Sequence, residues 1–269
     1  MLIDTHCHLD ASEFDADRSA VVQRAVEGGV RAIVIPAIAR NNFSAVRDLA
    51  HSFPGGTYAL GIHPMYVQFA DETDLAVLRA SVEAAMDDPH FVAIGEIGLD
   101  FFLPDISTGA AREKQERFYL AQLKIAAEFD LPVLLHVRRS QDILLKYLRR
   151  IRVRGGIGHA FNGSPQQAQA FVDMGFALGV GGAMTYSRAL NIRRLFADFG
   201  LESLVLETDA PDIPPEWLPT EHCRNEPAEV GRIAMSLSEL RQMPVDEVVA
   251  ATGATALRVL PRLAALDLS

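Results

Sequence analysis

The feature that most constrains the fold of this chain is a regular alternation of short apolar runs with longer segments of helical period. Eight such runs, rich in Val, Ile and Leu, lie at residues 1–6, 31–37, 57–63, 91–96, 131–136, 155–160, 176–181 and 203–208. A run that is apolar throughout, rather than at every second position, is typical of a strand buried on both faces of a parallel sheet.

The segments between these runs have the spacing and end signals of helices. We expect helices at 17–28, 42–52, 74–87, 110–129, 140–151, 164–174 and 187–199, and two more, at 226–241 and 244–264, after the last strand. A strand followed by a helix, eight times over, predicts a closed (β/α)8 TIM barrel with a short C-terminal helical extension. An open doubly wound sheet is the competing fold, but it would usually carry a glycine-rich phosphate fingerprint, which the sequence lacks.

The length of the chain fits one barrel. The chain has 269 residues, and a barrel of this type typically needs about 250. Neither a low-complexity tract nor a charge block nor a Pro/Ser-rich linker interrupts the sequence. We therefore expect a single domain over residues 1–269.

Composition and charge limit which partners the protein can bind and indicate the cellular compartment in which we expect it. The formal net charge of −10 argues against a protein that coats duplex DNA through a broad basic face. It does not exclude a nuclease, because a pocket that holds two divalent cations is locally positive. Cys7 and Cys223 make no disulfide framework, and the sequence shows neither a secretory signal nor a membrane-length apolar run. We expect a cytoplasmic protein without membrane association, and we infer no obligate protein partner.

Side chains that can bind metal recur at the ends of the predicted strands. They are His6, His8, His63, Glu96, His136, His159 and Asp209. In a parallel barrel the carboxyl ends of all strands open on one face, where barrel enzymes keep their active sites. Topology alone therefore predicts that these residues, distant in sequence, meet at one rim.

The first strand and the fourth carry the most informative positions. His6 and His8 are two residues apart, so both imidazoles point to the same side of a strand and can share a cation, while Cys7 points to the other side. Glu96 lies in an apolar run, where a lone carboxylate needs a cation or a salt bridge with Arg or Lys. Its two oxygens can bridge metals about 3.5–4 Å apart.

The later strands add two histidines and a carboxylate. A single histidine such as His136 is more often hydrogen-bonded core than a ligand, but His136 and His159 on neighbouring strands together favour ligands. Asp209 is expected both to bind metal and to accept a proton from the attacking water. Glu207 lies deeper in the strand and is the second candidate for that role. Asp209 and Glu96 are thus the predicted catalytic residues.

The surrounding residues suggest how a substrate is held. His63, Arg138 and Arg224 are candidates for contacts with a phosphate or a sugar, although a solvated surface position explains each arginine equally well. Asp100 either fixes a ligand imidazole or caps a loop. The imidazoles and carboxylates together predict two divalent metal ions. They suit Zn, Mn, Ni, Co or Fe(II) better than Mg, although one subsite, richer in carboxylate and water, could still accept Mg.

Ordered motifs along nearly the whole chain resemble the TatD-type metal-dependent deoxyribonucleases. These motifs are IDTHCH at 3–8, GIHP at 61–64, GEIGLDF at 95–101, LPVLLHVRRS at 131–140, GHAFNGS at 158–164, ETDAPD at 207–212 and RNEP at 224–227. The resemblance implies a barrel related to the amidohydrolase superfamily, with a two-metal site. It implies that one metal is held by His6 and His8 and completed by Asp209, that His136 and His159 hold the other, and that Glu96 bridges them.

The same resemblance implies a transiently bound single-stranded DNA substrate and, in some members, 3′–5′ exonuclease activity. Two departures from the family pattern concern the substrate side: Ala160 with Asn162, and the segment FFLPDIS at 101–107. The same metal site could instead hydrolyse a small amide, ester or lactone, or deacylate a charged tRNA. A non-catalytic, metal-stabilised binding protein is the least favoured alternative.

Overall fold

The computed structural model describes residues 1–218, 224–266 and 268. Its strands are β1 (Leu2–Asp4), β2 (Val30–Pro36), β3 (Gly56–Leu60), β4 (Phe91–Asp100), β5 (Val133–Arg138), β6 (Gly156–His159), β7 (Phe176–Val180) and β8 (Leu204–Leu206). They form one eight-stranded sheet in sequence order, with every neighbouring pair parallel. The N–H of Thr5 donates to the carbonyl of Leu206 at 3.0 Å, and Cys7 pairs with Ala210, so the last strand meets the first. The predicted (β/α)8 barrel is confirmed.

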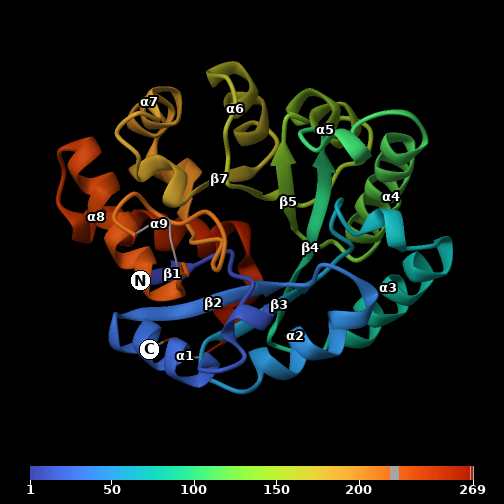
Figure 1. The fold of residues 1–269 in the computed structure, drawn as a ribbon, viewed down its shortest axis with the longest axis horizontal. Coiled ribbons are helices and arrows are strands. Elements are labelled where there is room, and N and C mark those ends of the chain that lie inside the picture. The colour runs from blue at the N-terminus through green and yellow to red at the C-terminus, as the bar shows by residue number, and fades with distance from the viewer. Residues whose placement is uncertain (219–223, 267, 269) are drawn as a thin grey trace.

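The helices surround the strands (Figure 1). They are α1 (Arg18–Glu27), α2 (Phe43–Ala50), α3 (Glu72–Ala85), α4 (Gly109–Glu128), α5 (Gln141–Leu148), α6 (Pro165–Val172), α7 (Leu190–Asp198), α8 (Val230–Arg241) and α9 (Val245–Val259). Each lies within the expected segment or within a residue or two of it. Among the described residues, no helix combines the length and apolar character needed to cross a membrane. Cys223, one of the two cysteines, lies outside the described residues.

The apolar core has two parts because each strand buries both of its faces. The larger part lies between the sheet and the helices. The smaller part fills the barrel interior with side chains such as Val34, Leu134 and Ile157, and it continues into Leu260 and Leu263 after α9. The C-terminal extension therefore closes the amino end of the barrel and leaves the carboxyl end open.

One strand runs further than the sequence predicts. The expected strand ended at Glu96, but β4 continues to Asp100. The pairing of β4 with β5 shifts in register between Ile94 and Ile97 and then resumes through Asp100, opposite Arg138. Glu96 consequently projects from the middle of a long, fully buried strand rather than from its end.

Candidate metal centre

The predicted ligands gather at the carboxyl end of the barrel, at the bottom of a cleft of about 1120 Å³. They come from different strands: His6 and His8 follow β1, His63 follows β3, Glu96 lies in β4, His136 in β5, His159 ends β6, and Asp209 follows β8. Parallel strand order thus brings together residues that span most of the sequence. Their nitrogen and oxygen atoms fall into overlapping groups in which all atoms lie within 4.8 Å of one another.

One group lies beside β1. The Oε2 atom of Glu96 is 3.1 Å from Nε2 of His6 and 3.3 Å from Nε2 of His8. The same two nitrogens are 3.3 Å apart, and Oδ1 of Asp209 lies 3.6 and 3.7 Å from them. Carboxylate oxygens of Glu96 and Asp209 thus both lie close to the same pair of imidazole nitrogens.

The other oxygen of Glu96 faces a second pair of imidazoles. Its Oε1 atom is 2.8 Å from Nδ1 of His136 and 3.4 Å from Nε2 of His63. Those two nitrogens are 3.0 Å apart. The two oxygens of one buried carboxylate thus face two different pairs of histidines.

His159 lies on the β1 side of the centre. Its ring stacks on His6 with centroids 3.7 Å apart, whereas the ring of His136 is 6.3 Å away. Its Nε2 atom is 3.5 Å from Oδ2 of Asp209. The pairing of His136 with His159 that the family resemblance implies stays a prediction, and His63 lies nearer to His136 than the sequence analysis anticipated.

Burial and mutual contact shift the pKa values of these groups. Burial raises the pKa of Asp209 to about 6. Burial also lowers the pKa of His63 to about 4. Although burial opposes ionisation of Glu96, the adjacent His63 and His6 hold its pKa well below the usual range. Glu96 is buried, and a carboxylate in such a place needs a hydrogen-bonded or cationic partner.

The donor set fits metal ions. Near Glu96, His6 and His8 direct ring nitrogens at each other and at the same carboxylate oxygen, an arrangement in which a single proton cannot satisfy all three atoms. A divalent cation accepts lone pairs from all of them at once. Imidazole nitrogens with carboxylate oxygens are the ligands that Zn and related transition metals take in proteins.

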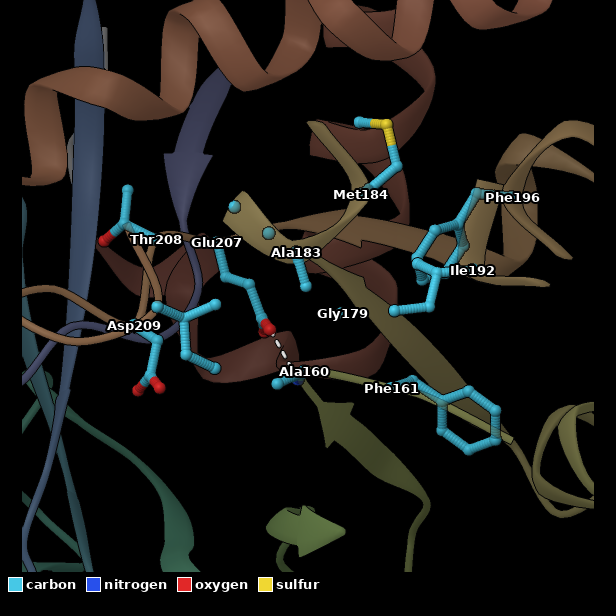
Figure 2. A pocket seen from close by; sticks show the side chains of 13 residues that line it. Ala160, Phe161, Gly179, Ala183, Met184, Ile192, Phe196, Glu207, Thr208 and Asp209 are labelled. Carbon is cyan, nitrogen blue, oxygen red and sulfur yellow. Dashed lines mark hydrogen bonds between the residues drawn. The ribbon is translucent and has the colours of Figure 1, made fainter. Parts of the chain in front are cut away.

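Carboxylates behind the centre fix two of the histidines. Oδ2 of Asp100 lies 3.2 Å from Nε2 of His136. Oε1 of Glu207 lies 3.1 Å from Nδ1 of His159 and accepts the N–H of Ala160 at 2.6 Å. Figure 2 shows Glu207 extending toward Ala160, while the carboxylate of Asp209 points to another side. Such contacts set the tautomer and ring orientation of metal-binding histidines.

The predicted substrate contacts separate into two kinds of position. His63 and Arg138 line the cleft. Arg224 instead bonds to Asp17 at 2.8 and 2.9 Å and to Glu226 at 2.8 Å. Its guanidinium therefore ties the segment after β8 to the start of α1, and we leave it out of the proposed substrate site.

The sequence analysis missed the neighbouring Asn225. Its side-chain amide is buried and donates to the carbonyls of Thr208 and Asp212, both at 2.8 Å. Asn225 thereby holds the loop that carries Asp209. The sequence signal for this role is the RNEP motif, in which Asn225 lies between two charged residues; the arginine of the motif was predicted instead. Of the departures from the family pattern, Ala160 and Asn162 line the cleft, and so does Phe102 of the segment 101–107.

Comparison with known proteins agrees with this geometry. The family described as "TatD related DNase" matches residues 3–261. The "Uncharacterized metal-dependent hydrolase YjjV" of Escherichia coli (strain K12) is 41% identical over 250 residues, which are 93% of each chain. The "3'-5' ssDNA/RNA exonuclease TatD" of Escherichia fergusonii is 33% identical over 246 residues and covers 89% of this chain and 91% of its own.

A solved structure extends the likeness to three dimensions. The crystal structure of YjjV, a TatD homolog from E. coli K12, has a TM-score of 0.90 at 39% sequence identity and covers 97% of this chain and 98% of its own. A cluster of His, Glu and Asp side chains that could hold metal ions lies at the mouth of the (β/α)8 barrel and accompanies this match. The chain belongs to the TatD family of metal-dependent hydrolases.

Proposed function

We propose that this protein hydrolyses phosphodiester bonds of single-stranded DNA, as a 3′–5′ exonuclease, with two divalent metal ions. The observation that carries the proposal is the position of Glu96. Its two oxygens face separate histidine pairs at distances of 2.8 to 3.4 Å, as a carboxylate that bridges two ions would. The name of the Escherichia fergusonii relative supports the choice of substrate.

The ligands divide between two ions in this proposal. His6, His8 and Asp209 would hold one, His136 and His159 would contribute to the other, and Glu96 would supply a carboxylate oxygen to each. His63, beside His136, would be a further neighbour of the second ion. When bound, the ions lower the pKa of a water molecule and offset charge on the phosphate. The elements themselves are left open by this donor set, with Zn and Mn preferred to Mg.

The protein's own groups then have distinct tasks. Asp209 accepts the proton of the attacking water, since its carboxylate lies among the proposed ligands, with Oδ1 3.6 Å from Nε2 of His6 and Oδ2 3.5 Å from Nε2 of His159. Asp100 and Glu207 hold the imidazoles of His136 and His159 in place. Arg138, at the edge of the cleft, provides positive charge for a phosphate.

The direct test uses single-stranded DNA labelled at one defined end. Purified protein is incubated with this DNA and with Mg, Mn or Zn, and products are resolved by length. We expect mononucleotides to be released stepwise from the 3′ end, with DNA labelled at the 5′ end shortening progressively. Asp209→Asn, which removes the proton acceptor while keeping its size, should abolish release.

Parallel assays separate this proposal from other hydrolytic reactions. A water activated in this cluster would also attack a carbonyl carbon, so amides, lactones, simple esters and aminoacyl-tRNA are included as substrates. Turnover of one of these compounds with no nucleotide release from DNA would overturn the nuclease proposal while keeping the metal-dependent hydrolase. Metal content measured by elemental analysis, on protein never exposed to chelator, gives the number of ions per chain independently of activity.

A further inference from the structure

We propose that Phe102, Arg138 and Arg139 form a binding subsite for one nucleotide of a single-stranded nucleic acid, beside the metal centre. We call these three residues the arginine–phenyl platform. The inference rests on the proposed function, because it names the part of the cleft that holds the strand next to the cleaved bond. It assigns stacking of a base to this platform and pairing of the adjoining phosphate to the guanidinium groups.

The side chains of Arg138 and Arg139 both lie over the ring of Phe102. The Cζ atom of Arg138 lies 4.0 Å from the centroid of the Phe102 ring, and that of Arg139 lies 4.7 Å from it. Phe102 nevertheless remains 42% exposed. All three residues line the same cleft as the metal ligands. A large apolar ring is thus held open to solvent at the entrance of the proposed active site.

The loop that carries Phe102 is held in place by hydrogen bonds to buried side chains. Oδ1 of Asp100 accepts the N–H groups of Phe102 and Leu103, at 2.8 and 3.2 Å. The buried amide of Gln115 bonds the N–H of Asp100 at 2.9 Å and the carbonyl of Ile106 at 2.7 Å. Exposure of the ring is therefore not the result of a loose loop, because buried polar groups hold the turn on both sides.

The arginines are anchored in a similar way. The hydroxyl of Ser140 accepts the N–H of Arg138 at 3.2 Å and donates to the carbonyl of Leu99 at 2.7 Å. Arg139, which lies between Arg138 and Ser140 in the sequence, adopts a left-handed φ of 54°. This φ is uncommon for a residue other than glycine. The turn after β5 is thus fixed to the end of β4, and both guanidinium groups reach the Phe102 ring.

The platform is connected to the metal centre through a single carboxylate. While Oδ1 of Asp100 holds the Phe102 turn, its Oδ2 atom lies 3.2 Å from Nε2 of His136 and 3.6 Å from Nη1 of Arg138. One buried residue therefore positions the platform and a proposed metal ligand together. A nucleotide on the platform is placed directly beside the phosphate that the metals would engage.

The distribution of charge favours the Arg138 and Arg139 side of the cleft for a nucleic-acid strand. The wall formed by the loops after β1 and β8 carries Asp10, Glu13 and Asp212. Among the described residues that line the cleft, the Lys or Arg side chains are Arg138 and Arg139. A polyanion is repelled from the first wall and attracted to the second. The exposed ring stands where the attracted strand must pass.

The chemistry of the platform matches single-stranded rather than duplex nucleic acid. Unpaired bases stack on aromatic rings and on guanidinium planes, and any base can do so because each has a π-face. Bases in a duplex are already stacked on each other, so their faces are not free to stack on the Phe102 ring. The platform therefore explains selection of single strands without requiring a preferred base.

The first test is kinetic and uses the metal-loaded enzyme with a single-stranded oligodeoxynucleotide. Phe102→Ala should raise KM by about 5- to 100-fold, the range expected for removal of one base–aromatic stack, with the larger part of the effect in KM rather than kcat. Phe102→Tyr should restore most of the affinity. Phe69→Ala is the matched control, because Phe69 is 79% exposed and does not line the cleft.

The second test measures binding and charge separately from turnover. In Phe102→Trp, the new indole should be quenched by a slowly cleaved phosphorothioate oligonucleotide, whereas the wild type, which has only Trp217, should show little change. Arg139→Ala should reduce the dependence of log Kd on log salt by about 0.7 for each phosphate that the variant no longer neutralises. Arg152→Ala, an exposed arginine before β6, should leave that slope unchanged.

The outcomes distinguish this inference from the proposed function. If the wild type releases no nucleotide from DNA, the proposed function is overturned. If the wild type cleaves DNA but Phe102→Ala and Phe69→Ala have the same KM and the Phe102→Trp indole is not quenched, only the platform is overturned. A raised KM that Phe102→Tyr does not rescue would also contradict stacking, because it would indicate disruption of the loop.

Discussion

The two ends of this barrel are built from the same strands, but one end is apolar and the other is lined with polar, ionisable side chains. At the amino end, Leu260 and Leu263 extend the apolar interior and exclude water. At the carboxyl end, buried imidazoles and carboxylates face each other at 2.8 to 3.7 Å, and Asp209 adopts a left-handed φ of 58°. The first arrangement contributes stability, whereas the second costs stability unless a cation compensates its charge.

The change between the two ends takes place within a single strand. On β5, Leu134 belongs to the apolar interior and His136, two residues later, belongs to the metal centre. On β6, Ile157 and His159 repeat this arrangement. Residues two apart point to the same face of a strand, so one step along each strand converts core into site. Activity and stability should therefore respond separately to substitutions at the two ends.

The largest expected effect is at the carboxyl end. Glu96→Ala removes the carboxylate that faces both histidine pairs, and because metal-ion stabilisation contributes several kcal/mol to such reactions, we expect kcat/KM to fall by about 1000-fold or more. The thermal midpoint of the metal-free protein should change little, because relief of the desolvation of Glu96 offsets the loss of its contacts with the histidines. Both quantities are measured on the same preparation. A large loss of metal-free stability would break the comparison between the ends.

Substitution of Leu263, in the segment that closes the amino end of the barrel, should lower stability and leave activity unchanged. Leu263→Ala leaves a cavity beneath the barrel interior, and we expect it to lower the free energy of unfolding by about 2–5 kcal/mol. Metal content and kcat per folded molecule should stay near wild-type values, because Leu263 lies at the closed end. Urea unfolding and elemental analysis check the two parts. Loss of bound metal in the folded variant would contradict the separation.

A smaller effect is expected behind the ligands. Glu207→Ala removes the acceptor for Nδ1 of His159 and for the N–H of Ala160, and removal of such an acceptor typically lowers metal affinity by about 10- to 100-fold. Glu207→Gln keeps an acceptor oxygen and should recover most of that affinity. Titration with Zn against a competing chelator measures it. Equal affinities for all three proteins would show that Glu207 does not position His159.

The smallest effect is a dependence of stability on pH. Asp100 is buried, which opposes its ionisation, but hydrogen bonds from His136 and from the N–H of Phe102 prevail and lower its pKa from 3.8 to about 2. A depressed pKa stabilises the folded state above the unfolded pKa, so this contribution, about 2 kcal/mol or less, should disappear as pH falls from about 4 to 2.

Comparison with a variant isolates that contribution. The stability of metal-free wild type should exceed that of Asp100→Asn at pH 6, and the two should converge toward pH 2, as measured by urea unfolding. Curves that remain parallel over this range would show that Asp100 is not the responsible group. Asp48→Asn, at an exposed position on α2, is the control for general effects of removing a carboxylate.

The sequence by itself determined the barrel and the membership of its rim. Apolar runs that alternate with helical segments leave parallel strands between helices as the consistent solution, and parallel strands place every carboxyl end on one face. For that reason His6, Glu96 and His136 could be expected to meet from their places in the sequence alone. The family resemblance pointed to the same residues, and the match over residues 3–261 agrees with it.

Only the tertiary structure decided which side chains contact one another at the rim. Strand register and loop conformation place His63 against His136, extend β4 to Asp100, engage Arg224 with Asp17 and leave Phe102 exposed beside Arg138 and Arg139. Periodicity tells which face of a strand a residue occupies, but not which neighbour its side chain reaches. That choice depends on distances across the barrel mouth, which are set by contacts between segments far apart in the chain.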